Sequence, residues 1–138
     1  SIIVFSGDYD RVHYALVMAS AAAATDRPVT LFFTMGATRT LLAPQPDGAP
    51  GWAALSATDG GISATDRDAE HAGAGVATLE ELLQACIDLD VTVRVCEMGL
   101  RTEGWEMSDF RTDLLIREGG MVSFLAEAEK DDGHIVFV

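Results

Sequence analysis

Apolar residues along this chain gather into short runs, and these runs alternate with longer segments in which apolar positions recur at helical spacing. Runs rich in Val, Ile and Phe are typical of buried strands, and the sequence predicts five of them, at residues 2–5, 29–34, 91–96, 113–116 and 134–138. The spacing predicts helices over about 12–23, from 79 past 86, at 105–111, and from 121 to about 130. Parallel strands need crossover helices, so the alternation favours an α/β fold with a parallel sheet covered on both faces.

One predicted helix carries a clear start signal. Thr78 and Glu81 have the spacing of a capping box, in which the threonine caps the helix and the glutamate reaches back to the backbone. The apolar stripe that follows consists of Leu79, Leu82, Leu83 and Cys86. Cys86 is therefore interpreted as a small core residue.

The composition changes between residues 37 and 75. Three of the 4 prolines lie there, as do seven of the 13 glycines if Gly36 is included. We expect a single domain over 1–138 in which 37–75 forms a long loop or insertion, with a helical turn around 52–55.

Composition excludes several function classes. The net charge of −13, from 22 acidic and 9 basic residues, disfavours nucleic acid and anionic membranes as partners. No apolar run reaches the roughly 18–20 residues that span a bilayer.

Two cysteines without a secretory signal predict thiols in a reducing cytoplasm rather than disulfides. The three histidines are scattered singly, and no zinc spacing, P-loop or complete dinucleotide fingerprint is present, so we expect neither metal nor cofactor.

Cys96 is the strongest candidate for chemistry, because it ends a predicted strand and precedes a turn at 97–99. Arg94 lies on the same face of that strand, roughly 7 Å away, and a guanidinium there favours the reactive thiolate. Glu97 has the opposite influence, and the sequence leaves the net effect open. A strand cysteine that merely packs is the alternative.

Strand ends converge on one edge of a parallel sheet, so residues after the neighbouring strands are candidates for the same site. We predict that Thr34, Met35 and Gly36 line it. Gly7 and Asp8 follow the first strand and are interpreted as a turn and a helix cap.

Three stretches resemble the DsrE/DsrF-like sulfur-carrier family, and more narrowly its DsrE2-type branch, which is often labelled "peroxiredoxin family protein". They are residues 1–10 with the alanine-rich helix and 29–34, residues 78–89 running into 95–98, and residues 119–125. The most specific element is the strand junction Cys96-Glu97-Met98 after a capped helix. The resemblance implies a three-layer α/β/α domain with five parallel strands, assembly into homo-oligomers, and a cysteine at position 96 that carries a persulfide.

The chain also departs from that branch. Met35-Gly36 follow the second strand where an aromatic residue is common, residues 37–75 do not match well, and two extra residues lie near 113–118. The proline-rich cysteine motif of true peroxiredoxins is missing, so peroxide reduction is not expected.

We therefore predict that Cys96 relays sulfane sulfur between donor and acceptor proteins, as a carrier or a persulfide sulfurtransferase. This requires a sulfur atom that is open to solvent at the rim of the sheet. The substrate-contacting residues would be Thr34, Met35, Gly36, Arg94, Glu97 and Met98. The alternative is a non-catalytic, oligomeric interaction module in which Cys96 is structural.

Overall fold

A single sheet of five parallel strands forms the centre of the protein. The computed structural model describes residues 1–130 and 133–138. The strands are β1 (Ile2–Val4), β2 (Thr30–Phe33), β3 (Thr92–Cys96), β4 (Ile116–Gly119) and β5 (Val136–Phe137), in the order β4-β3-β2-β1-β5. The predicted α/β architecture with five parallel strands is confirmed.

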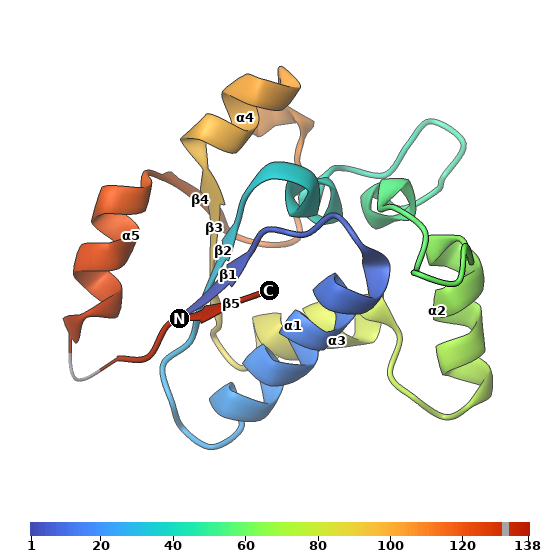
Figure 1. Cartoon of the computed structure of the whole chain (residues 1–138), viewed down its shortest axis with the longest axis horizontal. Coiled ribbons are helices and arrows are strands. Elements are labelled where there is room, and N and C mark those ends of the chain that lie inside the picture. The colour runs from blue at the N-terminus through green and yellow to red at the C-terminus, as the bar shows by residue number, and fades with distance from the viewer. Residues whose placement is uncertain (131–132) are drawn as a thin grey trace.

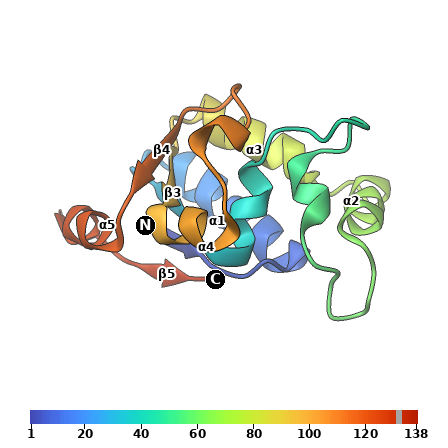
Figure 2. The same cartoon turned by 90° about the horizontal axis from the view of Figure 1, so that it is seen from above.

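Helices lie on both faces of the sheet, which gives three layers (Figures 1 and 2). The helices α1 (Tyr9–Ala23) and α3 (Leu79–Asp88) cover one face, and α5 (Met121–Ala128) covers the other. The helix α4 (Glu97–Glu103) and the 3₁₀ helix η1 (Met35–Leu41) lie at the carboxyl ends of the strands. The helix α2 (Ala64–Gly73) lies beyond α1, on the side away from α5. No helix in the part of the chain that the structure describes is long and apolar enough to cross a membrane.

The two faces bury very different amounts of apolar surface. Alternate strand residues face α1 and α3 and belong to the main core, among them Val4, Leu31, Phe33, Val93 and Val95. The opposite face contributes a small separate cluster of Ile3, Phe32 and Cys96, packed against Phe124 of α5. Because side chains alternate along a strand, every strand residue is committed to either the thick or the thin layer.

The helix α3 forms as its sequence predicts. The Thr78 backbone N–H donates to Oε2 of Glu81 at 2.7 Å, and the Glu81 N–H donates to Oγ1 of Thr78 at 3.3 Å, so both bonds of the capping box are present. Cys86 lies on the buried stripe and is 1% exposed.

The fourth strand and its surroundings differ from the prediction. The strand lies at 116–119 rather than at the predicted 113–116. Within the predicted range, Leu114 packs into the main core and Leu115 is exposed. A helix (α4) replaces the predicted turn at 97–99, and 105–111 contains only the 3₁₀ turn η3 (Met107–Asp109). β4 is an edge strand with the charged pair Arg117-Glu118, so it carries no apolar signal.

The segment 37–75 contains more helical structure than the predicted loop. The helical turn predicted around 52–55 is confirmed as η2 (Gly51–Ala54), but the expectation of a loop is wrong over α2. Ser63 caps α2 by accepting the Asp66 N–H at 3.2 Å. Of the residues in α2 only Ala64 is buried, so this helix has no apolar stripe for a periodicity argument to find.

Gly99 allows α4 to lie close against the end of β2. A Cβ placed on Gly99 would be 3.0 Å from the backbone nitrogen of Met35 and 3.4 Å from Oγ1 of Thr38. Glycine in a helix costs about 1 kcal/mol relative to alanine, so this glycine is present for its close approach. The packing sets the position of α4 across the strand ends.

We therefore expect Gly99→Ala to lower the free energy of unfolding by about 1–2 kcal/mol, because the new methyl group must displace backbone. Gly73→Ala is the matched control, since Gly73 is also helical and a Cβ there meets nothing within 4 Å. That variant should be neutral or more stable by up to about 1 kcal/mol. Urea denaturation of both variants checks this, and equal stability of the two would contradict the close packing of α4.

Candidate functional site

Cys96 occupies the predicted position at the carboxyl end of a strand. It is the last residue of β3, pairs in register with Gly119 of β4, and precedes the first turn of α4 as its N-cap residue. Both cysteines are free thiols. The site therefore lies at the edge where α/β proteins gather functional groups.

The expectation that this sulfur is open to solvent is wrong for the structure. Cys96 is only 4% exposed and packs with Ile3, Phe32 and Phe124, while Met121 lies against the same cluster. The rings of Phe32 and Phe124 are 4.6 Å apart, centroid to centroid. The physical reason is that α5 places Phe124 over the face of β3 that bears the thiol.

The two clefts that we describe lie elsewhere. One, of about 280 Å³, lies between residues 42–44, 50–51 and 110–113 with Glu80. The other, of about 420 Å³, lies along 72–81. Cys96 lines neither of them, so neither gives a reagent a path to its sulfur.

Arg94 shares the face of β3 with Cys96, as predicted. Its guanidinium lies over Gly119, where a Cβ would be 2.7 Å from Nη2. Nη1 donates to Oε2 of Glu127 in α5 at 2.6 Å. The Arg94 side chain is 12% exposed, and its Nε is buried without a hydrogen-bond partner among the described residues. The guanidinium on the face of β3 that bears Cys96 is thus paired with a carboxylate from α5, the helix that covers this face.

Glu97 and Met98 point to different surroundings. A Cβ on Gly120 would lie 3.1 Å from Oε1 of Glu97, so this carboxylate sits against the residue that precedes α5. Met98 is 67% exposed and does not belong to the cluster around Cys96.

Thr34, Met35 and Gly36 follow β2 as predicted, but they do not form an open rim. Thr34 is buried, and Gly99 of α4 lies close to both Thr34 and Met35. Gly36 packs against Gly7, whose Cα would be 3.0 Å from a Cβ on Gly36. The interpretation of Asp8 as a helix cap is confirmed, since its Oδ1 accepts the Arg11 N–H at 3.1 Å.

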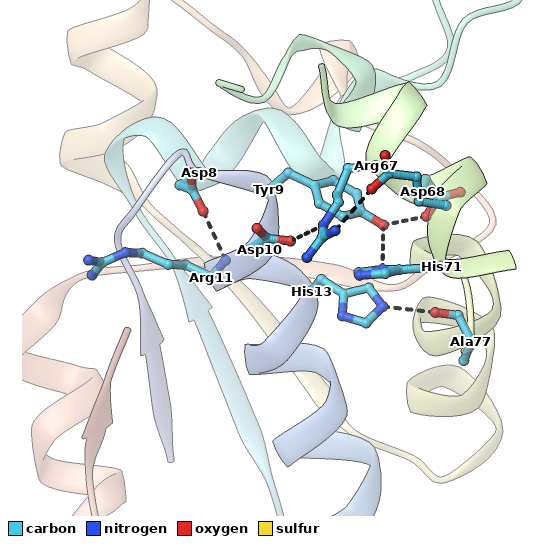
Figure 3. A network of polar contacts seen from close by, with 10 residues as sticks. Asp8, Tyr9, Asp10, Arg11, His13, Arg67, Asp68, His71 and Ala77 are labelled. Atoms are coloured by element: carbon cyan, nitrogen blue, oxygen red, sulfur yellow. Dashed lines mark hydrogen bonds and ion pairs between the residues drawn. The ribbon is translucent and has the colours of Figure 1, made fainter. Parts of the chain in front are cut away.

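A second polar cluster, which sequence reasoning missed, joins α1 to α2 (Figure 3). Tyr9 is fully buried, and its hydroxyl donates to Oδ1 of Asp68 at 2.5 Å and lies 3.5 Å from Nδ1 of His71. The rings of His13 and His71 are 4.3 Å apart, and Nε2 of His13 is 2.8 Å from the carbonyl oxygen of Ala77. The two histidines are therefore neighbours rather than isolated residues.

The available signal for this cluster was weak. Tyr9 and His13 are four residues apart on one helix, and Asp68 and His71 are three apart on another, so each pair shares a helical face. Only the packing of α2 on α1 brings the pairs together. Arg67 of α2 adds to the contact between the two helices through an ion pair from its Nε to Oδ1 of Asp10 in α1, at 2.9 Å.

Burial shapes the protonation of this cluster. Burial and the hydrogen bond to Asp68 raise the pKa of Tyr9 well above its usual range, so Tyr9 keeps its proton. Burial and the nearby His13 and Arg67 lower the pKa of His71 below 6.5. The cluster fixes α2 on the domain with a neutral His71. Among the described residues no group of three or more His, Cys, Asp or Glu could hold a metal ion.

The lowered pKa of His71 has a defined sign for stability. The unfolded chain binds a proton at His71 near pH 6.5, whereas the folded chain binds it only at lower pH. This contribution is complete above pH 6.5 and is lost as the pH falls towards the folded pKa. We expect the native protein to lose more stability between pH 7.5 and 5 than His71→Gln does. Urea denaturation at both pH values measures the difference, and parallel losses would contradict a lowered pKa of His71 in the folded protein.

No protein-family model matches the sequence, and no curated protein sequence is significantly similar to it. Solved structures do match over the full length. The ychN protein from E. coli is 11% identical with a TM-score of 0.55, and covers 100% of this chain and 98% of its own. MTH1491, a protein of unknown function from Methanobacterium thermoautotrophicum, is 13% identical with a TM-score of 0.50. The match covers 99% of this chain and 98% of the MTH1491 chain. Both have the DsrE-like fold, so the resemblance to that family is supported at the level of the fold.

Proposed function

We propose that this protein is a sulfur carrier of the DsrE2 type, or a sulfurtransferase-like protein, that relays sulfane sulfur as a persulfide of Cys96. One observation carries the proposal. A free thiol ends a central strand of a DsrE-like sheet, with the guanidinium of Arg94 on the same face. Sulfur exchange needs one thiolate and access to it rather than a large catalytic constellation. This site supplies one thiol on the strand face that also bears one cation, and the proposal requires the cover over the buried thiol to move.

The transfer is a thiol exchange in two balanced steps. The Cys96 thiolate attacks the outer sulfur of a donor R–S–SH, a new S–S bond forms, and the donor S–S bond breaks with its electron pair leaving on R–S⁻. The product is Cys96–S–SH, with no net oxidation or reduction. A thiolate of the acceptor protein then attacks the outer sulfur of Cys96–S–SH and releases the Cys96 thiolate.

The second cysteine supplies a contrast within the same chain. Cys86 is buried in the main core, and burial raises the pKa of its thiol to about 11. Such a thiol is a poor nucleophile at neutral pH. Cys86 also lies within α3 and away from the strand ends, so we assign the proposed chemistry to Cys96 alone, in a reducing cytoplasm that keeps both thiols free.

A homo-oligomer is part of the proposal. Phe137 pairs in register with Ile3, so it lies on the same face of the sheet as α5, and its ring is 5.5 Å from that of Phe5. Both rings are exposed, Phe137 by 65% and Phe5 by 44%. Exposed aromatic pairs next to a thinly covered sheet face are typical of surfaces that a partner covers.

The test is persulfide loading measured by intact mass. After treatment with a persulfide donor, the native protein and Cys86→Ala should each gain one sulfur atom, and Cys96→Ala should gain none. Reduction with dithiothreitol should remove the added sulfur, because a persulfide is a reducible S–S bond. Equal loading of the two alanine variants would discard the assignment to Cys96.

The burial of Cys96 favours a second candidate, a non-catalytic interaction module in which this thiol only packs. Thiol titration of the folded protein separates the two. An unreactive Cys96 in a protein with native circular dichroism would favour the module, and a reactive one would favour the carrier.

A further inference from the structure

The helix over Cys96 is held to the sheet by few buried groups. Within α5 only Phe124 and Ala128 are buried, while Val122 is 84% exposed and Leu125 is 38% exposed. Helices α1 and α3, by contrast, are anchored in the main core by residues such as Val12, Leu16 and Leu83. Segments with few buried apolar contacts are the ones that open first in native proteins.

One polar interaction adds to this small apolar contact. The ion pair between Arg94 and Glu127 joins β3 to the last turn of α5. The strand end of this pair is fixed, because the guanidinium lies flat over Gly119, where a Cβ would be 3.1 Å from Nε. The helix end is solvated, since the Glu127 side chain is 55% exposed. Breaking the pair therefore exposes a carboxylate that water can already reach.

We infer that α5 is a gate over Cys96 and that the Arg94–Glu127 ion pair is its latch; this inference rests on the proposed function and names how that site is regulated. Displacing α5 removes Phe124 and Met121 from the sulfur cluster and leaves the main core untouched. The other covers are less suited to opening. The helix α4 is packed through Gly99 onto backbone, and the far side of β3 is filled by Val93 and Val95.

The latch also determines which charge the site presents. With α5 closed, the guanidinium of Arg94 is neutralised by Glu127. With α5 open, the same guanidinium is free on the face that bears Cys96, in a protein whose net charge is −13. A persulfide donor in its anionic form then meets a local cation next to the thiol. Opening of the gate and attraction of the donor are thus two consequences of breaking one ion pair.

Alkylation of the folded protein tests the gate without any sulfur donor. Cys86 serves as the internal control, because it is labelled only when the main core opens. The measured quantity is the rate of Cys96 labelling by iodoacetamide divided by that of Cys86, read by peptide mass. We expect Glu127→Gln to raise this ratio about fivefold, as loss of one partly buried ion pair allows. Glu129→Gln, at the C-cap position directly after the same helix, should leave it within twofold.

Two further measurements keep the proposal testable if a variant folds poorly. In the native protein the ratio should rise with salt, because at 1 M salt the Debye length falls to about 3 Å and a half-exposed ion pair weakens. In Glu127→Gln that salt dependence should vanish. Anionic iodoacetate should also gain more from Glu127→Gln than neutral iodoacetamide does, because Arg94 is then free.

A ratio that stays within twofold of the native value in Glu127→Gln, or that does not respond to salt in the native protein, would overturn the gate. The gate and the proposed sulfur-carrier function can each fail while the other stands. Faster alkylation without persulfide loading leaves the gate standing and removes the sulfur carrier. Persulfide loading of Glu127→Gln at the same rate as the native protein would support the sulfur carrier and remove the gate.

Discussion

The alternation of side chains along β3 is the constraint on which the candidate site depends. Val93 and Val95 face the main core beneath α1 and α3, and this fixes Arg94 and Cys96 on the opposite face. Among the described residues, α5 is the helix that covers that face (Figure 1), and the face contributes few buried residues. A thiol at this position is therefore both buried and close to a thinly anchored layer of the protein, whereas a thiol at position 95 would lie in the thick core.

Glycines at the strand ends then decide what surrounds the thiol. Gly119 lets the guanidinium of Arg94 lie over β4, and Gly120 lets the carboxylate of Glu97 lie at the start of α5. Gly99 brings α4 down onto the end of β2, so the rim predicted from the strand ends is closed by a helix rather than open to solvent. Close packing at this edge thus leaves no open cleft at the strand ends, and the proposed access to Cys96 lies on the side covered by α5.

The polar cluster around Tyr9 shows the same physics on the other side of the molecule. Helix α2 buries almost no apolar surface, so it is held by polar contacts, chiefly the bond from Tyr9 to Asp68 and the ion pair from Arg67 to Asp10. Buried hydrogen bonds of this kind are favourable only when all partners are in place. Both peripheral helices, α2 and α5, therefore depend on a few charged or polar pairs, while α1 and α3 depend on apolar packing.

The sequence by itself determined the parallel α/β sheet, its five strands, the capped helix α3 and the place of Cys96 at the end of β3, because apolar periodicity and capping are local properties of the chain. It placed β4 three residues early, since an edge strand with Arg117 and Glu118 needs no apolar run, and it missed α2, since a helix held by polar contacts shows no apolar stripe. Only the tertiary structure decided that α5 covers the thiol, that Glu127 pairs with Arg94, and that His13 meets His71. Those contacts join residues far apart in the chain, and their existence depends on how helices pack on the sheet, which no local pattern records.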